Sequence, residues 1–403
     1  MNTIQIIYTV LLTVSFVAMS GWLIMYLRVA SSVRASISVL EGRDAPEPEG
    51  GWPGVSVVIP AHNEEDVIER CARSLMAQRY DRMQVVFALD RCTDRTEELL
   101  RAVIGDDPRF EVVVIDECPE DWAGKCNAAA TGARRATGDF LVFTDADTEF
   151  DPDLVRSSIA IAIEREVDLL SILSTLSSAR WDERIVQPVA TMNLLRMHPI
   201  DSVNRRERPR AFANGQFMLF TRSIYERVGG HEGVHLDLLE DIAFARQVQK
   251  QGGRGIIVNA DRMLNVTMYE GLRALCAGWK RIYIEVARRR PRRLINWGIR
   301  ILVAGVMVPA VEVATIVFAL LLVSRGGDAL WSVLGTGVAA VALFLQFLSL
   351  GWIYRLGHAP LSGLIAFPIG SLIVGWIMFD GARDLLLSRP IHWGGREYVL
   401  KPD

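Results

Sequence analysis

Long apolar runs at both ends of this 403-residue chain constrain its fold more than any other feature. Residues 4–27 are nearly uncharged and could cross the ~30 Å hydrocarbon core of a bilayer as one helix. Three more apolar segments lie near the other end, at residues 301–323, 330–354 and 361–379. Buried helices of a large soluble core are the alternative for these three. Three in succession, with short glycine-containing joints, favour membrane spans.

The first apolar run has a signal peptide as its competing interpretation. It lacks a basic segment before it, its apolar stretch is too long, and no small-residue cleavage site follows. We therefore expect an uncleaved anchor. The last run contains Pro368 and three glycines, so a re-entrant or interfacial segment is the alternative to a full crossing there.

Basic residues flank the middle of the chain, which reads as a soluble domain. Arg28, Arg34 and Arg43 precede it, and further arginines follow it at positions 288, 289, 290, 292, 293 and 300. Because basic loops stay on the cytoplasmic side, we expect a multi-pass protein of the cell (inner or plasma) membrane with this domain in the cytoplasm and the N-terminus outside.

The side of the C-terminal tail is a conflict between two arguments. An outside N-terminus followed by four full spans puts the C-terminus outside. Basic residues in the tail instead favour the cytoplasm, at positions 383, 389, 396 and 401. We expect a cytoplasmic tail whose residues 393–396 pack near the soluble domain.

Composition excludes some classes of function. The net charge of −3 averages a basic membrane-facing part with a more acidic domain. No basic face continues through the domain, and no known nucleic-acid recognition motif is present. We therefore expect no nucleic-acid partner. Five scattered cysteines without a C-x-x-C pair fit a reducing cytoplasm and predict neither disulfides nor zinc.

The soluble part alternates β-rich runs with helical patterns. We expect strands at residues 55–59, 84–89, 111–115 and 140–143, and helices at residues 66–78, 93–100, 123–136 and 151–166. Asp151 is expected to cap the last helix, with Pro152 at its first position. This alternation predicts an α/β fold with a mostly parallel sheet covered on both faces. A Pro-, Gly- and Glu-rich segment, residues 41–54, links it to the anchor.

Acidic and amide side chains follow three of the expected strands. Asp145 and Asp147 come directly after the fourth run, and the loops at residues 61–64 and 90–94 follow the first two. Ligands of open α/β sheets bind at the carboxyl ends of strands. Carboxylate oxygens suit Mg²⁺ or Mn²⁺, which share their coordination with substrate phosphates. An Asp pair after a strand is also common in turns and caps.

Seven short motifs, in order, resemble the inverting family 2 glycosyltransferases, which have a glycosyltransferase-A fold. They are Val-Val-Ile-Pro-Ala-His-Asn-Glu-Glu (57–65), Leu-Asp-Arg-Cys-Thr-Asp-Arg-Thr (89–96), Gly-Lys-Cys-Asn (124–127), Thr-Asp-Ala-Asp (144–147), Ala-Asn-Gly-Gln (213–216), Gly-Gly-His (229–231) and Leu-Glu-Asp-Ile-Ala (239–243). Together they cover residues 55 to about 285. The apolar segments and the tail motif at 393–396 look most like the subgroup that glycosylates membrane lipids such as carotenoids and hopanoids.

The resemblance implies a nucleotide-sugar site. Backbone groups of Pro60 and Ala61, with Glu64, would hold the ribose and base of the nucleoside. Asp90 would accept a hydrogen bond from the uracil N–H. Family members often carry two adjacent Asp residues here, and this chain has only the second. Lys125 would face the diphosphate, because a compact ammonium suits phosphate.

The resemblance also implies the metal site and the base. Asp147, with Asp145 beside it, would hold the divalent cation that bridges the diphosphate. Asp241, with Glu240, would be catalytic: inversion needs a carboxylate that takes the proton of the acceptor hydroxyl. Acidic residues are also common at helix starts, where they favour the dipole, so residues 240–241 have that alternative interpretation.

Acceptor contacts are implied for Asn214, Gln216 and Trp279. Polysaccharide synthases of the family carry Gln-x-x-Arg-Trp after the base, and here residues 275–281 keep only Trp279 of that pattern. This departure favours transfer of a single sugar over processive synthesis. Trp279 is expected to stack on the acceptor or lie under the nucleotide; an interfacial anchor is the alternative.

Three further features of the sequence could bind a membrane, a metal or an anion. Residues 269–297 are basic, amphipathic and contain tryptophans, which predicts interfacial helices on the cytoplasmic leaflet. His231 and His235 are four residues apart, but the surrounding glycines favour a loop over a metal pair. Arginines at 205, 206, 208 and 210 form a basic loop that suits anionic headgroups, an acidic acceptor or solvent.

We therefore divide the chain into an anchor (1–30), a linker (31–54), a catalytic domain (55–268), interfacial helices (269–297), C-terminal transmembrane segments (298–382) and a tail (383–403). The expected function is membrane-bound inverting transfer of one hexose, from a nucleotide sugar such as a UDP-sugar, to a membrane lipid hydroxyl at the cytoplasmic leaflet. A polyprenyl-phosphate glycosyltransferase or polysaccharide synthase is one alternative. A non-catalytic scaffold that binds nucleotide or lipid is the other, and the complete set of acidic positions argues against it.

Overall fold

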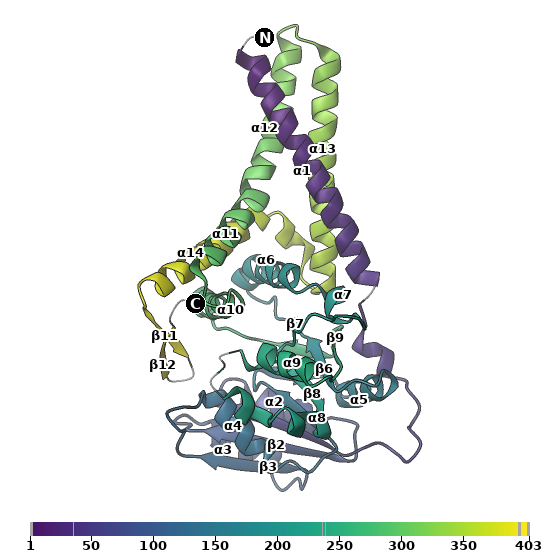
Figure 1. Ribbon diagram of the computed structural model, residues 1–403, viewed down its shortest axis with the longest axis vertical. Coiled ribbons are helices and arrows are strands. Elements are labelled where there is room, and N and C mark those ends of the chain that lie inside the picture. Colours follow the sequence, from purple (N-terminus) through teal and green to yellow (C-terminus); the bar gives the residue numbers. More distant parts are fainter. Residues whose placement is uncertain (1–2, 35, 236, 238, 394–395, 401–403) are drawn as a thin grey trace.

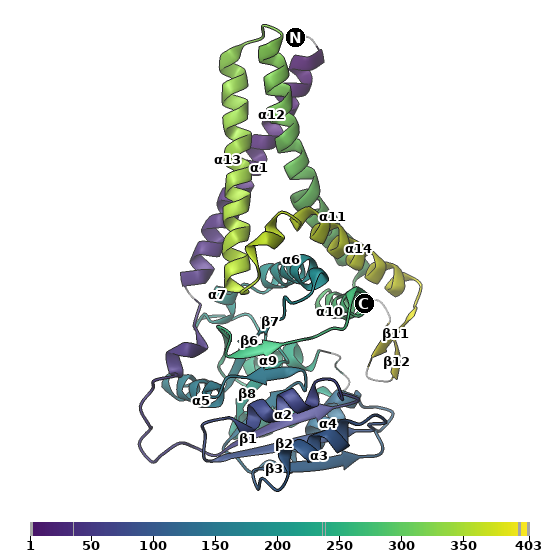
Figure 2. The same cartoon turned by 180° about the vertical axis from the view of Figure 1, so that it is seen from behind.

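The chain folds into an α/β base, a layer of slanted helices above it, and a stalk of long helices (Figure 1). The computed structural model describes residues 3–34, 36–235, 237, 239–393 and 396–400. Figure 2 shows the same arrangement from behind, with the N-terminus at the far end of the stalk from the base.

The base is built on a seven-stranded sheet whose strand order is β3-β2-β1-β4-β8-β6-β9. All neighbouring strands pair in parallel except β8, which is antiparallel to β4 and β6. The prediction of a mostly parallel sheet is thus confirmed. The strands are β1 (Val55–Ala61), β2 (Met83–Asp90), β3 (Phe110–Ile115), β4 (Phe140–Thr144), β6 (Leu169–Leu173), β8 (Phe217–Thr221) and β9 (Gly255–Asn259).

Helices cover both faces of this sheet, as the strand–helix alternation predicts. Val57 and Ile59 of β1 point into a core shared with α2, α3 and α5, whereas Val58 points into a second core shared with α4, α8 and α9. This alternation follows from the two-residue period of a strand. The helices are α2 (Ile68–Met76), α3 (Thr96–Ile104), α4 (Gly124–Ala133), α5 (Leu154–Glu164), α8 (Arg222–Arg227) and α9 (Glu240–Lys250).

The predicted cap of α5 was wrong. The residue at the cap position is Asp153, not Asp151. The Asp153 carboxylate is buried and pairs with Arg43 at 3.2 Å and with Arg79 at 3.3 Å. Asp151 instead accepts the Asp153 N–H at 3.0 Å. Asp153 therefore fastens the segment that follows the anchor to the base.

A small second sheet fixes the end of β4. It has the order β5-β10-β7, from β5 (Thr148–Phe150), β10 (Leu264–Val266) and β7 (Thr175–Leu176). Because β5 begins four residues after β4 ends, the acidic turn between them is held at both sides. This places the turn at the carboxyl edge of the large sheet.

Among the described residues, three helices are long and apolar enough to cross a membrane: Thr3–Arg34, Pro291–Ser324 and Ala329–Leu356. They are α1, the continuous run of α11 (Pro291–Leu302), the π-turn η3 (Val303–Met307) and α12 (Val308–Ser324), and then α13 (Ala329–Leu356). Buried polar contacts join them. Tyr8 donates to the Trp331 carbonyl at 2.8 Å, and the Ser15 and Thr315 hydroxyls lie 2.9 Å apart.

The fourth apolar segment does not form a stalk helix. It becomes η4 (Leu361–Leu364) and α14 (Phe367–Leu386), and α14 lies along α11 in the slanted layer (Figure 1). The polar end of α14 explains this position, since Asp380 and Asp384 accept from Lys280 at 2.9 Å and 2.5 Å. The packing of α14 thus differs from that of the three stalk helices, and the choice between a full crossing and a re-entrant or interfacial segment at residues 361–379 stays a prediction.

The slanted layer consists of α6 (Trp181–Met197), α10 (Leu272–Val286), α11 and α14. Their apolar faces share one core that includes Leu275, Trp279 and Tyr283 of α10. Residues 269–297 were expected to lie wholly at the interface. Of the two helices that begin in this range, α10 also ends within it. The other, α11, continues beyond the range as the first part of the long helix of residues 291–324.

Short elements complete the fold. The segment after α1 pairs with β9, since the Asn259 N–H donates to the Ile37 carbonyl at 2.8 Å. The elements are η1 (Val39–Gly42), α7 (Ile200–Val203), η2 (Gly230–Val234), β11 (Pro390–Trp393) and β12 (Arg396–Val399). Residues 394–395 of the tail motif lie outside the described residues, so its predicted packing stays a prediction.

Candidate active site

Asp145 and Asp147 lie in the turn between β4 and β5, at the carboxyl edge of the large sheet. Threonines on either side fix this turn. Thr144 donates to the Gln216 carbonyl at 2.7 Å, and Thr148 donates to the Asp145 carbonyl at 2.7 Å. The acidic turn is therefore attached to the loop that precedes β8, and its carboxylates have a fixed backbone.

Lys125 lies between two carboxylates that are far apart in the sequence. At the start of α4, its ammonium lies 2.7 Å from Asp145 and 2.7 Å from Glu240. Burial opposes the charge of Lys125, but these two carboxylates raise its pKa above the ordinary value. Lys125 is thus charged and joins the acidic turn to the start of α9.

Asp241 is held by backbone donors. Its Oδ2 accepts the Gly215 N–H at 2.9 Å, and its Oδ1 accepts the Ile242 N–H at 2.6 Å. Burial, and then the charge of Glu240, raise the pKa of Asp241 to about 7. For Glu240 burial acts in the same direction, but Lys125 outweighs it and lowers the pKa. Near neutral pH, Glu240 is a fixed anion and Asp241 exchanges its proton.

Gly215 keeps the space among these charged groups open. A Cβ at this position would lie 3.3 Å from Asp241 Oδ2, 3.4 Å from Lys125 Nζ and 3.5 Å from Glu240 Oε1. Such distances are tighter than, or at the limit of, ordinary contact. A residue without a side chain therefore lets the loop before β8 approach all three groups.

The neighbouring amides hold this loop in place. Asn214 donates through Nδ2 to Gln216 Oε1 at 3.1 Å and to the Ile172 carbonyl at 2.9 Å, and the Ser174 hydroxyl also donates to Gln216. Both side chains thus bond to the protein itself. Their predicted contact with an acceptor remains a prediction, and positioning of Gly215 is what their bonds accomplish here.

Asp147 has an unsatisfied, buried oxygen. Its Oδ1 has no hydrogen-bond partner within the described part of the chain. Burial, then the charges of Asp145 and Glu64, raise the pKa of Asp147 well above its ordinary value. Burial and the charges of Asp145 and Asp94 likewise raise the pKa of Glu64 to about 7. Acidic groups are thus concentrated here, and the charge of Lys125 only partly offsets their mutual repulsion.

This donor set fits a hard divalent cation. Asp145 and Asp147 offer oxygen ligands only, and the unpaired Oδ1 is buried, where an uncompensated charge is costly. In the described residues, no group of three or more His, Cys, Asp or Glu is placed to hold a metal. Two carboxylates with substrate oxygens to complete the shell are the usual arrangement for Mg²⁺.

The loops after β1 and β2 brace each other. Asn63 accepts the Thr93 N–H at 2.8 Å, and the Glu64 N–H donates to the Thr96 hydroxyl at 2.7 Å. Asn63 and Arg91 have φ values of 56° and 48°, a left-handed conformation that costs a non-glycine residue of order 1 kcal/mol. Strained backbone of this kind persists where surrounding bonds enforce it, commonly at binding sites.

Asp90 lies at the end of β2, as predicted, but it is already paired. Both of its oxygens accept from Arg91, at 3.0 Å from Nε and 2.5 Å from Nη2. Its carbonyl lies 2.6 Å from His62 Nδ1, which donates there. Pro60 and Ala61 end the neighbouring strand β1. Arg91 directly follows Asp90, but it was not singled out in the sequence, because adjacency along the chain does not by itself show that two side chains pair.

Trp279 is part of the core of the slanted layer. It is 3% exposed, its ring lies 5.7 Å from that of Tyr283, and its indole Nε1 has no partner among the described residues. An interfacial anchor against lipid and a stacking contact with an acceptor would both need exposed surface, which this side chain lacks here. The acceptor role remains a prediction.

Tyr269 is a residue that sequence reasoning missed. Its hydroxyl is buried without a partner in the described structure. Burial is the main cause that raises its pKa to about 12. The charge of Arg281 lowers this pKa, and the charges of Asp147 and Asp145 raise it. Gly278 gives it room, because a Cβ there would lie 2.3 Å from the Tyr269 ring. Position 278 belongs to the stretch that departs from the synthase pattern.

The two histidines form no metal pair. His231 Nδ1 lies 2.8 Å from the Tyr225 hydroxyl inside an aromatic cluster, and burial lowers its pKa to about 3. His235 Nδ1 donates to the Glu232 carbonyl at 2.7 Å. A 3-10 turn, η2, carries His231, which agrees with the loop interpretation.

Comparison with known proteins places this geometry in a family. Residues 56–229 match the family model described as Glycosyl transferase family 2. The 4,4'-diaponeurosporenoate glycosyltransferase of Staphylococcus haemolyticus is 23% identical over 241 residues, which are 59% of this chain and 63% of that protein. The probable glycosyltransferase YdaM of Bacillus subtilis is 34% identical over 97 residues, 24% of this chain and 23% of that protein. The chain thus matches less than two thirds of either relative.

Among solved structures, the mannosyltransferase PcManGT from Pyrobaculum calidifontis, in complex with GDP-Man and Mn²⁺, is 19% identical with a TM-score of 0.47. That alignment covers 90% of this chain and 99% of the other. The family match spans β1 through α8, and so includes the acidic turn, Lys125 and the loop before β8. Residues 56–229 of this chain, somewhat less than half of its length, are therefore similar to the glycosyl transferases of family 2.

Proposed function

We propose that the protein is a membrane-bound inverting glycosyltransferase. It moves one hexose from a nucleotide sugar, a UDP-sugar in the first instance, to the hydroxyl of a membrane lipid at the cytoplasmic leaflet. The observation that carries the proposal is the joining of Asp241, Gly215, Lys125 and Asp145 at one edge of the sheet. This arrangement places the Asp241 carboxylate, whose pKa is near neutral, beside the Lys125 ammonium and the acidic turn, whose carboxylates could bind a metal ion.

Asp241 is the general base of the proposed reaction. As the acceptor oxygen attacks the anomeric carbon, Asp241 takes the hydroxyl proton, and the bond from that carbon to the diphosphate oxygen breaks. Attack from the face opposite the leaving group inverts the configuration. A base works best when its pKa lies near the working pH, and the value of about 7 for Asp241 meets that condition. Glu240 keeps this value raised.

Lys125 and the acidic turn act on the leaving group. Asp147 and Asp145 would hold a Mg²⁺ or Mn²⁺ ion, and such an ion supplies positive charge that stabilises the departing nucleoside diphosphate. Lys125 adds a second positive charge, because its ammonium is already directed to this turn at 2.7 Å from Asp145. Contact with the diphosphate would replace one of its two carboxylate contacts.

The remaining donor contacts come from the two braced loops. Pro60, Ala61 and Glu64 would hold the nucleoside, and Asp90 would accept the uracil N–H while keeping one oxygen on Arg91. The mutual hydrogen bonds of Asn63 and Thr93 support this proposal, because they pre-organise the backbone that would contact the nucleotide.

A lipid acceptor is supported by the position of the site under the slanted helices (Figure 1). The three long apolar helices would hold the base at a bilayer, with Trp279 and the loop of Asn214 and Gln216 on the acceptor side. The Staphylococcus relative is named for transfer to a carotenoid acid, and that name supports a lipid over a polymer. The lost synthase pattern at residues 275–281 supports a single transfer.

The cytoplasmic orientation rests on the arginines that flank the base. Single cysteines introduced at Asp106 in the base and at Gly326 between α12 and α13, in a background without the native cysteines, test it with a membrane-impermeant thiol reagent. We expect labelling at 326 in intact cells and labelling at 106 only after permeabilisation. The reverse pattern would place the base outside the cytoplasm.

The transfer itself is tested with the purified full chain, Mn²⁺, a panel of UDP- and GDP-sugars, and lipid extracts. Mass spectrometry should find a lipid heavier by one hexose, absent with Asp241→Asn and present with the matched control Asp106→Asn, which alters an exposed carboxylate. Lipid-linked chains of many sugars would instead identify a polymer synthase. No turnover of any nucleotide sugar, hydrolysis included, would favour the non-catalytic scaffold.

A further inference from the structure

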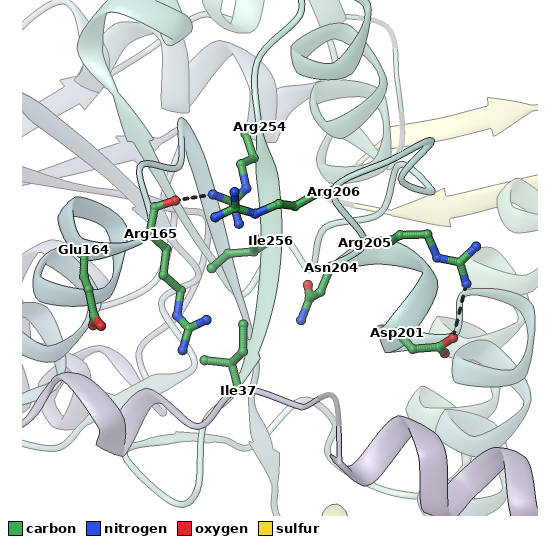
Figure 3. A pocket seen from close by; sticks show the side chains of 9 residues that line it. All are labelled: Ile37, Glu164, Arg165, Asp201, Asn204, Arg205, Arg206, Arg254 and Ile256. Carbon is green, nitrogen blue, oxygen red and sulfur yellow. Dashed lines mark hydrogen bonds and ion pairs between the residues drawn. The ribbon is translucent and has the colours of Figure 1, made fainter.

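A second polar cavity lies away from the acidic turn, where β9 begins (Figure 3). Its volume is about 560 Å³. Its lining is Ile37, Glu164, Arg165, Asp201, Asn204, Arg205, Arg206, Arg254 and Ile256. Ile256 lies at the amino end of β9 and Arg254 directly precedes this strand, whereas the candidate active site uses the carboxyl edge of the sheet. The cavity is thus separate from that site.

The cavity has more positive charge than its own carboxylates neutralise. Arg165 pairs with Glu41 at 2.7 Å, and Arg205 lies 3.8 Å from Asp201. Arg206 and Arg254 have no carboxylate within ion-pair distance in the described part of the chain. Their guanidinium groups overlap in the view of Figure 3, and the charge of Arg206 acts on Arg254, so the two lie within electrostatic reach of each other. Two adjacent cations therefore lack a counter-charge.

Individual donors in the cavity are also unused. Arg165 Nε is buried and has no acceptor among the described residues. Arg254 donates one N–H to the Arg165 carbonyl, which fixes its direction and leaves its other donors free for a ligand. Burial, then the charges of Arg206 and Arg165, lower the pKa of Arg254. An anion in the cavity would relieve this repulsion and satisfy the donors together.

The cavity is also tied to the membrane end of the protein. Ile37 lies three residues after the end of α1, the first of the long apolar helices. Ser32, in the last turn of α1, donates to Asp201 at 3.1 Å. The segment that leaves the anchor therefore forms one wall of the cavity, within reach of the headgroup region.

We propose that this arginine cavity binds the phosphate group of an anionic ligand, supplied by the headgroup of an anionic membrane phospholipid. Guanidinium groups match phosphate oxygens with paired N–H donors, so two adjacent arginines are suited to one phosphate. Bound headgroup would hold the base at a fixed height beneath the bilayer. This inference is independent of the proposed sugar transfer, because it uses none of the same residues.

The test measures lipid binding to the purified full chain in detergent by native mass spectrometry. Phosphatidylglycerol, phosphatidylcholine and inorganic phosphate are titrated separately. Wild type should prefer phosphatidylglycerol to phosphatidylcholine. Arg206→Gln with Arg254→Gln should weaken phosphatidylglycerol binding about 25-fold, since each arginine near an anionic surface contributes about fivefold.

The control is Arg208→Gln with Arg227→Gln, which removes the same charge from exposed positions outside the cavity and should leave binding unchanged. Arg206→Gln alone guards against misfolding, because no hydrogen bond of that side chain supports the described fold; it should weaken binding about fivefold. If inorganic phosphate displaces the lipid and its binding is weakened by the same variants, the phosphate site is supported and its ligand is a soluble phosphate compound. Equal loss in the control and cavity variants, or no preference for phosphatidylglycerol or phosphate, would overturn the proposal.

Discussion

The pH dependence of turnover should respond to Glu240 in a direction that the structure fixes. If Asp241 is the base, only its deprotonated form works, so kcat/KM should fall tenfold per pH unit below a midpoint of about 7. After burial, the charge of Glu240 is the largest cause that raises this pKa. Glu240→Gln removes that charge with little change of shape, and the acidic limb should move to lower pH.

The size of the shift follows from the contacts at Gly215. A Cβ there would lie 3.3 Å from Asp241 Oδ2 and 3.5 Å from Glu240 Oε1, so the two oxygens are separated by at most about 7 Å. At an effective dielectric constant of about 20, two unit charges at about 7 Å repel by about 2 kcal/mol, equal to about 1.5 pH units. We expect the limb of Glu240→Gln near pH 5 to 6, by order of magnitude.

The assay follows release of the nucleoside diphosphate from pH 5 to 9 with the lipid acceptor present. Lys125→Met is the opposite perturbation, because Lys125 lowers the pKa of Asp241, and its limb should move to higher pH. Asp241→Asn should lose the limb and about 10²- to 10⁴-fold of the rate at high pH. A limb that stays in place in Glu240→Gln, or persists in Asp241→Asn, would show that another group titrates.

Three further outcomes are expected. Asp147→Asn should lose metal-dependent binding of UDP while retaining the fold, because an amide is a poorer ligand than a carboxylate; calorimetry with UDP and Mn²⁺ measures this, and unchanged affinity would contradict the metal site. Lys280→Met should destabilise the chain by up to about 3 kcal/mol, since Asp380 and Asp384 lose their shared partner, and adding Asp380→Asn and Asp384→Asn should restore part of the loss in thermal unfolding. Gly138→Ala should cost about 1–3 kcal/mol, because its Cβ would lie 2.5 Å from the Ser56 nitrogen; an unchanged unfolding midpoint would show that the backbone shifts freely.

The sequence predicts the strands β1 to β4 of the sheet, because they are apolar runs that alternate with helical patterns. The strands β6, β8 and β9 were not predicted, and the antiparallel direction of β8 could not be, because a strand's period is the same in both directions. The last apolar segment was left open for a related reason. Its apolar content fits a span and its polar end is visible in the sequence, but only the contacts of Asp380 and Asp384 with Lys280 show that this end packs against α10.

The features of the candidate site likewise fall into those that the sequence predicts and those that it does not. The position after an expected strand identified Asp145 and Asp147, since the carboxyl edge of a parallel sheet collects such loops. Lys125 and Asp241 were predicted from the resemblance to family 2 glycosyltransferases, and they lie at the starts of α4 and α9. The pairing of Lys125 with Glu240 joins residues more than a hundred positions apart, and no local pattern encodes it. Tyr269 was missed because a lone tyrosine carries no signal until Gly278 makes room for it.

The double contact of Lys125 suggests how donor binding and base strength are coupled. In this structure Lys125 lies 2.7 Å from both Asp145 and Glu240, and its charge lowers the pKa of the adjacent Asp241. A diphosphate competes for the same ammonium, so its binding should draw that charge away and raise the pKa of Asp241 in the complex. The acidic limb of kcat reports the complex and that of kcat/KM the free enzyme. The limb of kcat should therefore lie at higher pH, and a lower or equal position would mean that Lys125 keeps its contact with Glu240 throughout turnover.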